Sequence, residues 1–409
     1  PYWNPSIHGG QPLLTNPHYA TFYPPSWLVF VLPAEYVIGL LVFLHALWAF
    51  LGTWRLAQRW GCESAPAALA AVAFIGAGAF VSSPNLLNLF LGMAWLPWIL
   101  RWGAEALGQE SRRGWIYPGI KAAVGIGAQV LVGSPIMPLL SLLALACVAS
   151  DSFPGHWKRV LRLVPIGSAA AALAAIQLLP TLRHIANSSR GTGLDLTTAT
   201  TWSTPPIRLL ELFWPRIFGD PTLAEFLLYF GYPGIERPVP LILFIYVGLM
   251  IVALALGGLR DRGLPHRRAL VALILLGTFL SLGRYNPLYS TLLVKIPPFS
   301  VIRFPEKFLI LTTTGLVLAA ALTWQRILAS QGRQRMALLK GPMIVAGVAL
   351  VLTAILYLTP LLAPDLALHL IEGTSAEQLD WYEKPADATG LPADVLAARA
   401  GYLGKETFM

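Results

Sequence analysis

The chain has 409 residues, of which 56% are hydrophobic and only 12% are charged, and its formal net charge at pH 7 is +9. This composition excludes an ordinary soluble domain, because the apolar residues come in blocks of roughly 15 to 20, the length that crosses a bilayer core. The basic residues gather in short loops between blocks, so the positive charge indicates membrane orientation and lipid headgroup contact rather than nucleic-acid binding.

The first segment, residues 1–32, is predicted to be an extracytoplasmic loop. Repeated prolines exclude a long regular helix there. Trp3 and Asn4 precede a proline, and His8 precedes a Gly-Gly pair that permits a sharp turn. The simpler interpretation is an interfacial anchor, since Trp and Tyr favour the headgroup layer. An anchor does not require a Gly-Gly turn between polar side chains, so these residues are also binding candidates.

Ten apolar segments are expected to span the membrane, which predicts an all-α polytopic membrane protein. Their approximate ranges are 33–54, 65–81, 86–102, 116–132, 136–149, 160–179, 239–256, 269–283, 308–324 and 343–362. Six of these transmembrane helices fall within 33–181 and four within 239–362. Two segments, 136–149 and 269–283, are short enough to be core helices or re-entrant pieces instead. The alternation of basic and non-basic loops favours counting both.

Five short loops, one after every second segment, contain more than half of the 29 Lys and Arg residues. These loops are 55–64, 101–114, 151–162, 260–268 and 326–340. By the positive-inside rule they face the cytoplasm. Both ends of this chain are then extracytoplasmic.

The second long outside loop, 182–238, contains a predicted amphipathic helix. Residues 206–214 place their apolar side chains on one helical face, which is typical of a short helix lying along the membrane surface. Its polar face is expected to carry Arg208 and Glu211. An incidental ion pair is the simpler interpretation of these two residues, and a catalytic role is the alternative.

The third long outside loop, 284–307, leads into an apolar span through Arg303, Pro305, Glu306 and Lys307. Proline and an acidic residue in the first turn favour a helix start. A positive side chain beside a helix N-terminus suits a phosphate group, because the unpaired N–H groups there already favour an anion. Snorkelling of the two basic side chains to lipid headgroups is an equally good interpretation.

Several strings in this order resemble YfhO-like bacterial membrane proteins. They are Trp3-Asn4-Pro5, Gly9-Gly10-Gln11-Pro12-Leu13 and Phe22-Tyr23-Pro24; Gln177 to Thr181 with Ser189-Arg190; Ser281 to Gly283 with Pro287-Leu288; and Arg303 to Phe308. The likeness covers residues 1 to about 325. YfhO-like proteins are similar to family C (GT-C) glycosyltransferases, which take a sugar from a polyprenyl-phosphate lipid and attach it outside the cytoplasm.

The resemblance implies a multi-pass protein of the bacterial inner (plasma) membrane that transfers a sugar to an envelope glycan or a protein. The lipid-phosphate and substrate-binding candidates are then Arg303, Lys307, Arg190, His8, Asn4 and Trp3. The catalytic candidates are Asp220 and Glu211. In this fold class an acid early in the first outside loop is usual, but residues 1–32 contain none. We therefore expect this chain to be a fragment that lacks its first membrane helix, and 363–409 to begin a further extracytoplasmic region.

Two other classes of protein stay open. A transporter or flippase of a lipid-linked or polar solute predicts charged or broken helices near the bilayer midplane. A non-enzymatic envelope assembly protein predicts a partner-binding surface in 363–409. The sequence has no P-loop, dinucleotide fingerprint or zinc-ligand spacing, so no cofactor is expected, although a divalent metal is compatible with a transferase. The expected partners are membrane lipids, the polyprenyl-phosphate-linked sugar and its acceptor, and not nucleic acid.

Overall fold

The structure is a computed structural model that describes residues 3–5, 10–152, 155–186, 194–222, 240–291, 295–296, 299 and 303–362. Three of the sequence predictions lie outside these residues: the binding roles of His8 and Arg190, and the region 363–409.

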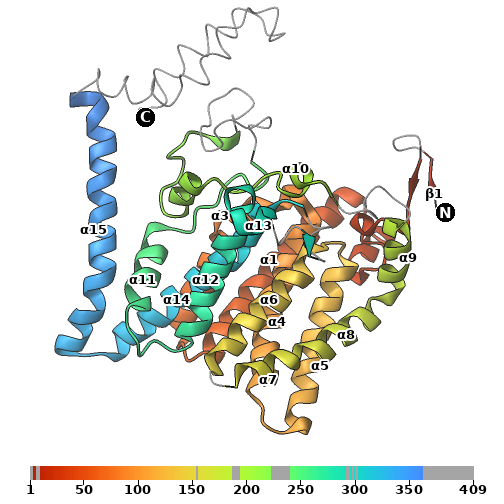
Figure 1. The fold of residues 1–409 in the computed structure, drawn as a ribbon, viewed down its shortest axis with the longest axis horizontal. Helices are drawn as coiled ribbons and strands as arrows, with labels where there is room; N and C mark the ends of the chain where they lie inside the picture. Colours follow the sequence, from red (N-terminus) through yellow and green to blue (C-terminus); the bar gives the residue numbers. More distant parts are fainter. Residues whose placement is uncertain are drawn as a thin grey trace, which may run out of the picture.

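Helices make up nearly all of the regular structure (Figure 1). The longer ones are α1 (Ala34–Arg59), α2 (Ser64–Gly76), α4 (Leu87–Gly108), α5 (Arg112–Leu131), α6 (Ile136–Ala149), α8 (Leu163–Leu173), α9 (Ala175–Ala186), α11 (Leu249–Leu259), α12 (Arg267–Ser281), α14 (Leu309–Ala329) and α15 (Gly332–Leu362). The shorter ones are α3 (Gly78–Val81), α7 (His156–Leu161), α10 (Leu196–Ala199) and α13 (Pro287–Thr291). Two-residue strands, β1 (Trp3–Asn4) and β2 (Gln11–Pro12), pair antiparallel near the start of the chain.

All ten predicted segments contain helix, but three of them differ from a single straight span. Segment 160–179 is divided between α8 and α9, with a bend of 88° between the α7–α8 part and α9. Segment 65–81 breaks between α2 and α3, and segment 239–256 becomes helical only at Leu249. Segments 65–81 and 239–256 meet at these irregular positions. The Gly78 N–H, at the break between α2 and α3, donates to the carbonyl of Tyr246, in the non-helical part of the second segment, at 2.6 Å.

Three of the described helices are long and apolar enough to cross a membrane, and the bent pair would make a fourth. They are Ala34–Arg59, Pro305–Ala329 and Gly332–Ile355. The chain is therefore a helical membrane protein by the length and composition of these helices. About ten spans is a larger number than this criterion supports.

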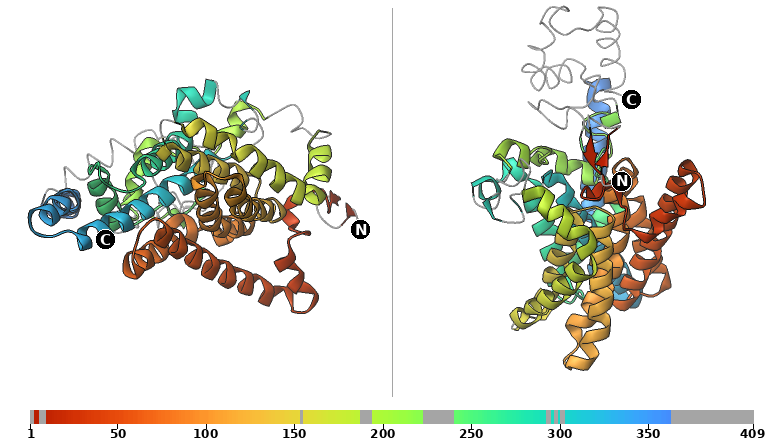
Figure 2. Two further views of the ribbon diagram at one scale, coloured as in Figure 1. Left: turned by 90° about the horizontal axis from the view of Figure 1, so that it is seen from below. Right: turned by 90° about the vertical axis from the view of Figure 1, so that its right-hand side faces the viewer.

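The centre of the bundle is α14. In its most apolar stretch 89% of the residues are buried, against 11% in α15. Helix α14 packs against α11, α12 and α2, and small residues let the backbones approach: a Cβ on Gly277 of α12 would lie 2.6 Å from the Thr312 nitrogen. Figure 2 shows α15 at the side of the bundle. Beyond Lys340 its exposed side chains, such as Leu350, are mostly apolar and suit contact with lipid.

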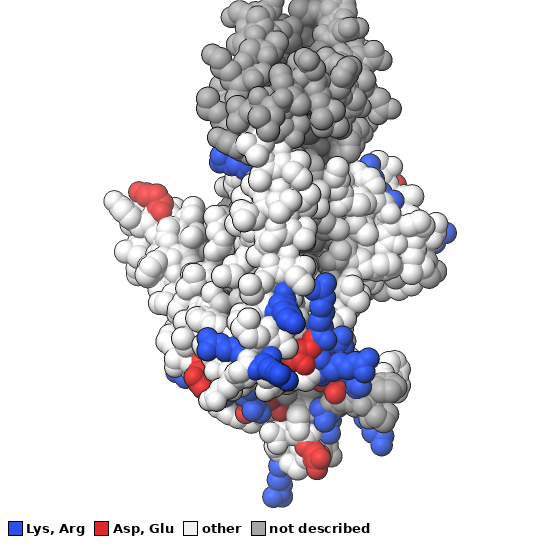
Figure 3. All heavy atoms as spheres, turned by 90° about the vertical axis from the view of Figure 1, so that its left-hand side faces the viewer, with Lys and Arg blue, Asp and Glu red and all other residues white. Residues whose placement is uncertain are grey.

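The five basic loops lie together at one end of the molecule, which we call the basic end. The Glu63 N–H donates to the Gln325 side chain at 2.9 Å, and His266 contacts the Asp151 carboxylate at 2.8 Å. The Arg162 side chain likewise donates to the Gln109 carbonyl. In Figure 3, which views the molecule from the α15 side, most of the visible Lys and Arg gather toward this end, and the central surface directly above them is largely uncharged. The segments predicted to lie outside are at the opposite end (Figure 1).

Arg208 and Glu211 lie on one face of residues 206–214 and form the expected ion pair, but this face is buried inside the protein. Pro206–Leu212 form a 3₁₀ helix, η5, in which Arg208 is fully buried and Glu211 is 4% exposed, whereas Ile207 is 49% exposed. The charged side chains point inward because each finds a charged partner there. The apolar side chains face outward, where an aqueous surface would disfavour them and lipid would not.

Candidate phosphate-binding site

The candidate site is built on a short turn, η9 (Pro305–Phe308), that leads into α14. Pro305, Glu306 and Phe308 are buried, and Glu306 forms an ion pair with Arg208. Arg208 also contacts Glu211 at 3.0 Å and donates to the Ile242 carbonyl at 2.6 Å. A buried guanidinium with these partners fixes the turn to η5 and to the 240–248 segment.

A second contact holds the chain just before this turn. The Glu306 N–H donates to the Trp202 carbonyl at 3.0 Å, and the Trp202 and Phe304 rings meet edge to face with centroids 4.5 Å apart. Both residues have a positive φ, 53° at Trp202 and 75° at Phe304, which is costly for side chains of this size. Strain of this kind is found mainly where the surrounding structure must hold a functional geometry.

Two cations lie close to the Phe304 ring. The Arg303 guanidinium carbon and the Lys307 ammonium nitrogen are each 4.8 Å from its centroid. Cation–π attraction stabilises each position and offsets part of the repulsion between the like charges.

The facing wall comes from the first loop and from the turn before α6. The Asn88 amide donates to the His18 carbonyl at 3.0 Å and also to the Val132 carbonyl. These two hydrogen bonds join the first loop to the turn before α6. Gly133 has φ +82°, and a Cβ there would collide with the Pro17 carbonyl. The first loop and the α5–α6 turn are therefore in direct backbone contact.

These segments enclose a cavity of about 210 Å³ at the end opposite the basic end. Its polar lining comprises His18, Asn88, Ser134, Arg303 and Lys307, and no Asp or Glu of the described residues lines it. The α4 and α6 helices both begin at its wall, since Asn88 and Ile136 belong to their first turns. Two cations and two helix N-termini around one cavity favour a bound anion.

An apolar cavity of about 280 Å³ adjoins this one and shares Gly133 and Pro135 with it. Its lining includes Ile126, Val130 and Leu178. A ligand with a charged head and a long hydrocarbon tail would match the two cavities together.

The other predicted site residues lie elsewhere. Asn4 is in β1 and does not line the cavity, and of Trp3 only the backbone is described, in the same strand. Glu211 is in the buried network of Arg208. Asp220 pairs with Arg216 at 3.2 Å and accepts from the Thr222 N–H. Neither acid lines the cavity with Arg303 and Lys307.

Sequence reasoning did not single out His18, Asn88 or Phe304. His18 belongs to the first loop, which was expected to take part in binding. Its position in that loop, next to a proline and aromatic residues, could have identified it as a further binding candidate. The role of Asn88 could not be predicted from the sequence, because this residue lines the cavity only once three separate segments of the chain are in contact. Among the described residues no three His, Cys, Asp or Glu side chains form a group that could hold a metal ion.

Comparison with models of protein families, with curated proteins and with solved structures finds no match for this chain.

Proposed function

We propose that this protein is a membrane glycosyltransferase of the GT-C type that uses a polyprenyl-phosphate-linked sugar. One observation carries the proposal: Arg303 and Lys307 line a cavity to which the described part of the chain contributes no acid, and an apolar cavity adjoins it. The first would bind the lipid phosphate and the second the start of the isoprenoid chain. The proposal includes about ten spans, with the basic end in the cytoplasm of a bacterium and both described chain ends outside it.

In this proposal Arg303 and Lys307 neutralise the phosphate as the bond from the sugar to the phosphate breaks. Charge stabilisation of a leaving phosphate is a main source of rate enhancement in such reactions. The base that takes the proton of the acceptor hydroxyl must lie within hydrogen-bond reach of it. His18 is the side chain of this type among the cavity-lining residues. Asp220 and Glu211 would need to move to take that role.

The experiment compares Arg303→Ala with Lys295→Ala in the membrane-embedded protein. Lys295 is an exposed residue of the same loop that lines neither cavity, so its loss changes the net charge equally. Transfer of radiolabelled sugar from the polyprenyl phosphate should fall by about a hundredfold in Arg303→Ala and stay unchanged in Lys295→Ala. Equal activity of both variants would remove Arg303 from the site.

A flippase for the same lipid is the second candidate, because one predicted span bends by 88° between α8 and α9. The contacts at the bend favour the transferase. Gln177 donates to the Leu14 carbonyl at 3.1 Å and Thr181 donates to the Thr15 carbonyl at 2.9 Å. The bend thus holds the first loop beside the apolar cavity, which Gln177 and Thr181 also line. Lipid movement across vesicles without sugar transfer would favour the flippase.

A further inference from the structure

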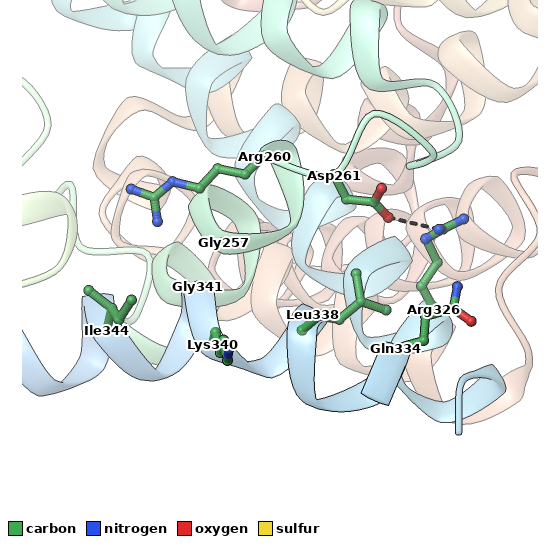
Figure 4. A pocket seen from close by; sticks show the side chains of 10 residues that line it. Gly257, Arg260, Asp261, Arg326, Gln334, Leu338, Lys340, Gly341 and Ile344 are labelled. Atoms are coloured by element: carbon green, nitrogen blue, oxygen red, sulfur yellow. Dashed lines mark ion pairs between the residues drawn. The ribbon is translucent and has the colours of Figure 1, made fainter. Parts of the chain in front are cut away.

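A separate cavity of about 450 Å³ lies at the basic end, between α11, α14 and α15 (Figure 4). One face of α15 forms a wall, with Gln334, Ala337, Leu338, Gly341 and Ile344 at helical spacing. The helices touch where a Cβ on Gly341 would lie 2.8 Å from the Gly257 Cα.

The charged lining of this cavity is predominantly positive. Arg260, Arg326 and Lys340 contribute three cations, and Asp261 contributes one acid. Asp261 is paired with Arg326 at 2.8 Å, and Arg326 also donates to the Gly263 carbonyl. The Arg260 and Lys340 side chains, from the two facing helices, make no ion pair or hydrogen bond within the described part of the chain, and both are exposed. The cavity therefore has an excess of two positive charges available to an anion.

The surface that continues from the cavity is apolar. Beyond Lys340, α15 exposes Met343 (62%), Ile344 (60%) and Val348 (54%). Figure 3 shows this face, with cations at the basic end and an uncharged surface above them. A small soluble anion would use only the charged part, whereas a phospholipid would use both.

We propose that this cavity binds the phosphate headgroup of an anionic phospholipid, with the acyl chains lying along the exposed face of α15. Arg260 and Lys340 bind the phosphate from opposite walls, and the Asp261–Arg326 pair closes one side. Basic pockets between membrane helices at the cytoplasmic surface have the chemistry to recognise such headgroups. This site is independent of the proposed transferase site, which lies at the other end.

The test measures binding of fluorescently tail-labelled phosphatidylglycerol to the purified full chain in detergent. The double variant Arg260→Gln/Lys340→Gln is compared with Arg262→Gln/Arg335→Gln, which removes two exposed cations of the same end that do not line the cavity. We expect the first variant to bind about 30-fold more weakly, since each cation beside an anionic lipid contributes roughly a fivefold gain. The control variant should bind like the wild type.

Equal affinity of the two double variants would overturn the proposal, whether both bind well or both bind weakly. Equal binding of labelled phosphatidylcholine would overturn it too, because that headgroup has no net charge. Glycerol phosphate serves as the soluble competitor. Displacement of the lipid by glycerol phosphate at equal concentration would contradict a lipid ligand and indicate a soluble phosphate instead.

Discussion

Arg208 and Glu306, 98 residues apart in the sequence, form an ion pair, and both side chains are fully shielded from solvent. The pair joins η5 to the turn η9, which contains Lys307 and directly follows Arg303 and Phe304. The geometry of the candidate site therefore depends on a residue that does not line it.

Arg208→Met should destabilise the protein strongly. Removing the guanidinium leaves Glu306 and Glu211 as buried carboxylates without their shared cation, at a cost of about 3–5 kcal/mol. Glu211→Gln keeps the Arg208–Glu306 pair and should cost clearly less. Thermal unfolding in detergent measures both, and equal loss in the two variants would contradict this order.

Gly133→Ala should disrupt the contact between the first loop and the α5–α6 turn. The new Cβ would meet the Pro17 carbonyl and would stand on a residue with φ +82°, so a loss of about 2 kcal/mol or more is expected, together with weaker lipid binding. Gly39→Ala is the control, because nothing lies within 4 Å of its Cβ position. It should leave binding unchanged.

Two buried tyrosines should respond oppositely to loss of the hydroxyl. The Tyr23 hydroxyl donates to His45 Nε2 at 2.6 Å and accepts from the Trp95 indole at 3.0 Å. Tyr23→Phe leaves both groups without that partner and should cost about 1–3 kcal/mol. The Tyr289 hydroxyl has no hydrogen-bond partner in the described structure, so Tyr289→Phe should be neutral or stabilising. Thermal unfolding of the two variants at pH 7 tests the difference.

The same tyrosine predicts a pH dependence. Burial raises the pKa of Tyr23 from 10.0 to about 12. The folded state therefore keeps the proton that the unfolded state loses, and stability falls as the pH rises from 10 to 12. Tyr23→Phe should make this fall shallower in unfolding curves recorded across that range. An unchanged slope would show that the phenol is not shielded.

His18→Ala should lower sugar transfer by about a hundredfold and leave polyprenyl-phosphate binding intact, if the proposed transferase uses His18 as its base. Parallel loss of binding and transfer would instead give His18 a role in holding the phosphate. A binding assay with the non-transferable lipid phosphate separates the two.

The helices were predictable from the sequence to a useful degree, and the contacts between them were not. Segment 136–149 coincides with α6, because an apolar run with a proline before it defines both its length and its start. The burial of Arg208 was not predictable, since its partners Glu306 and Ile242 come from segments far from it in the sequence and Glu211 is its near neighbour. Arg303 and Lys307 were selected for their position before a helix, and the structure brings them to one cavity.

The break at Gly78 shows why hydropathy misjudges some spans. Apolar residues 65–81 satisfy a length rule, but a helix cannot continue where its glycine N–H is used by a non-helical segment almost 170 residues later in the chain. Hydropathy reads each segment alone and does not detect such a partner.

The position of α14 has a consequence for biosynthesis. This helix is the most enclosed of the three candidate spans, yet it is the second-last helix of the described chain. Helices α2, α11 and α12 therefore leave the ribosome before α14, against which they pack, has been made. The faces that they turn toward α14 are buried only when that helix joins them.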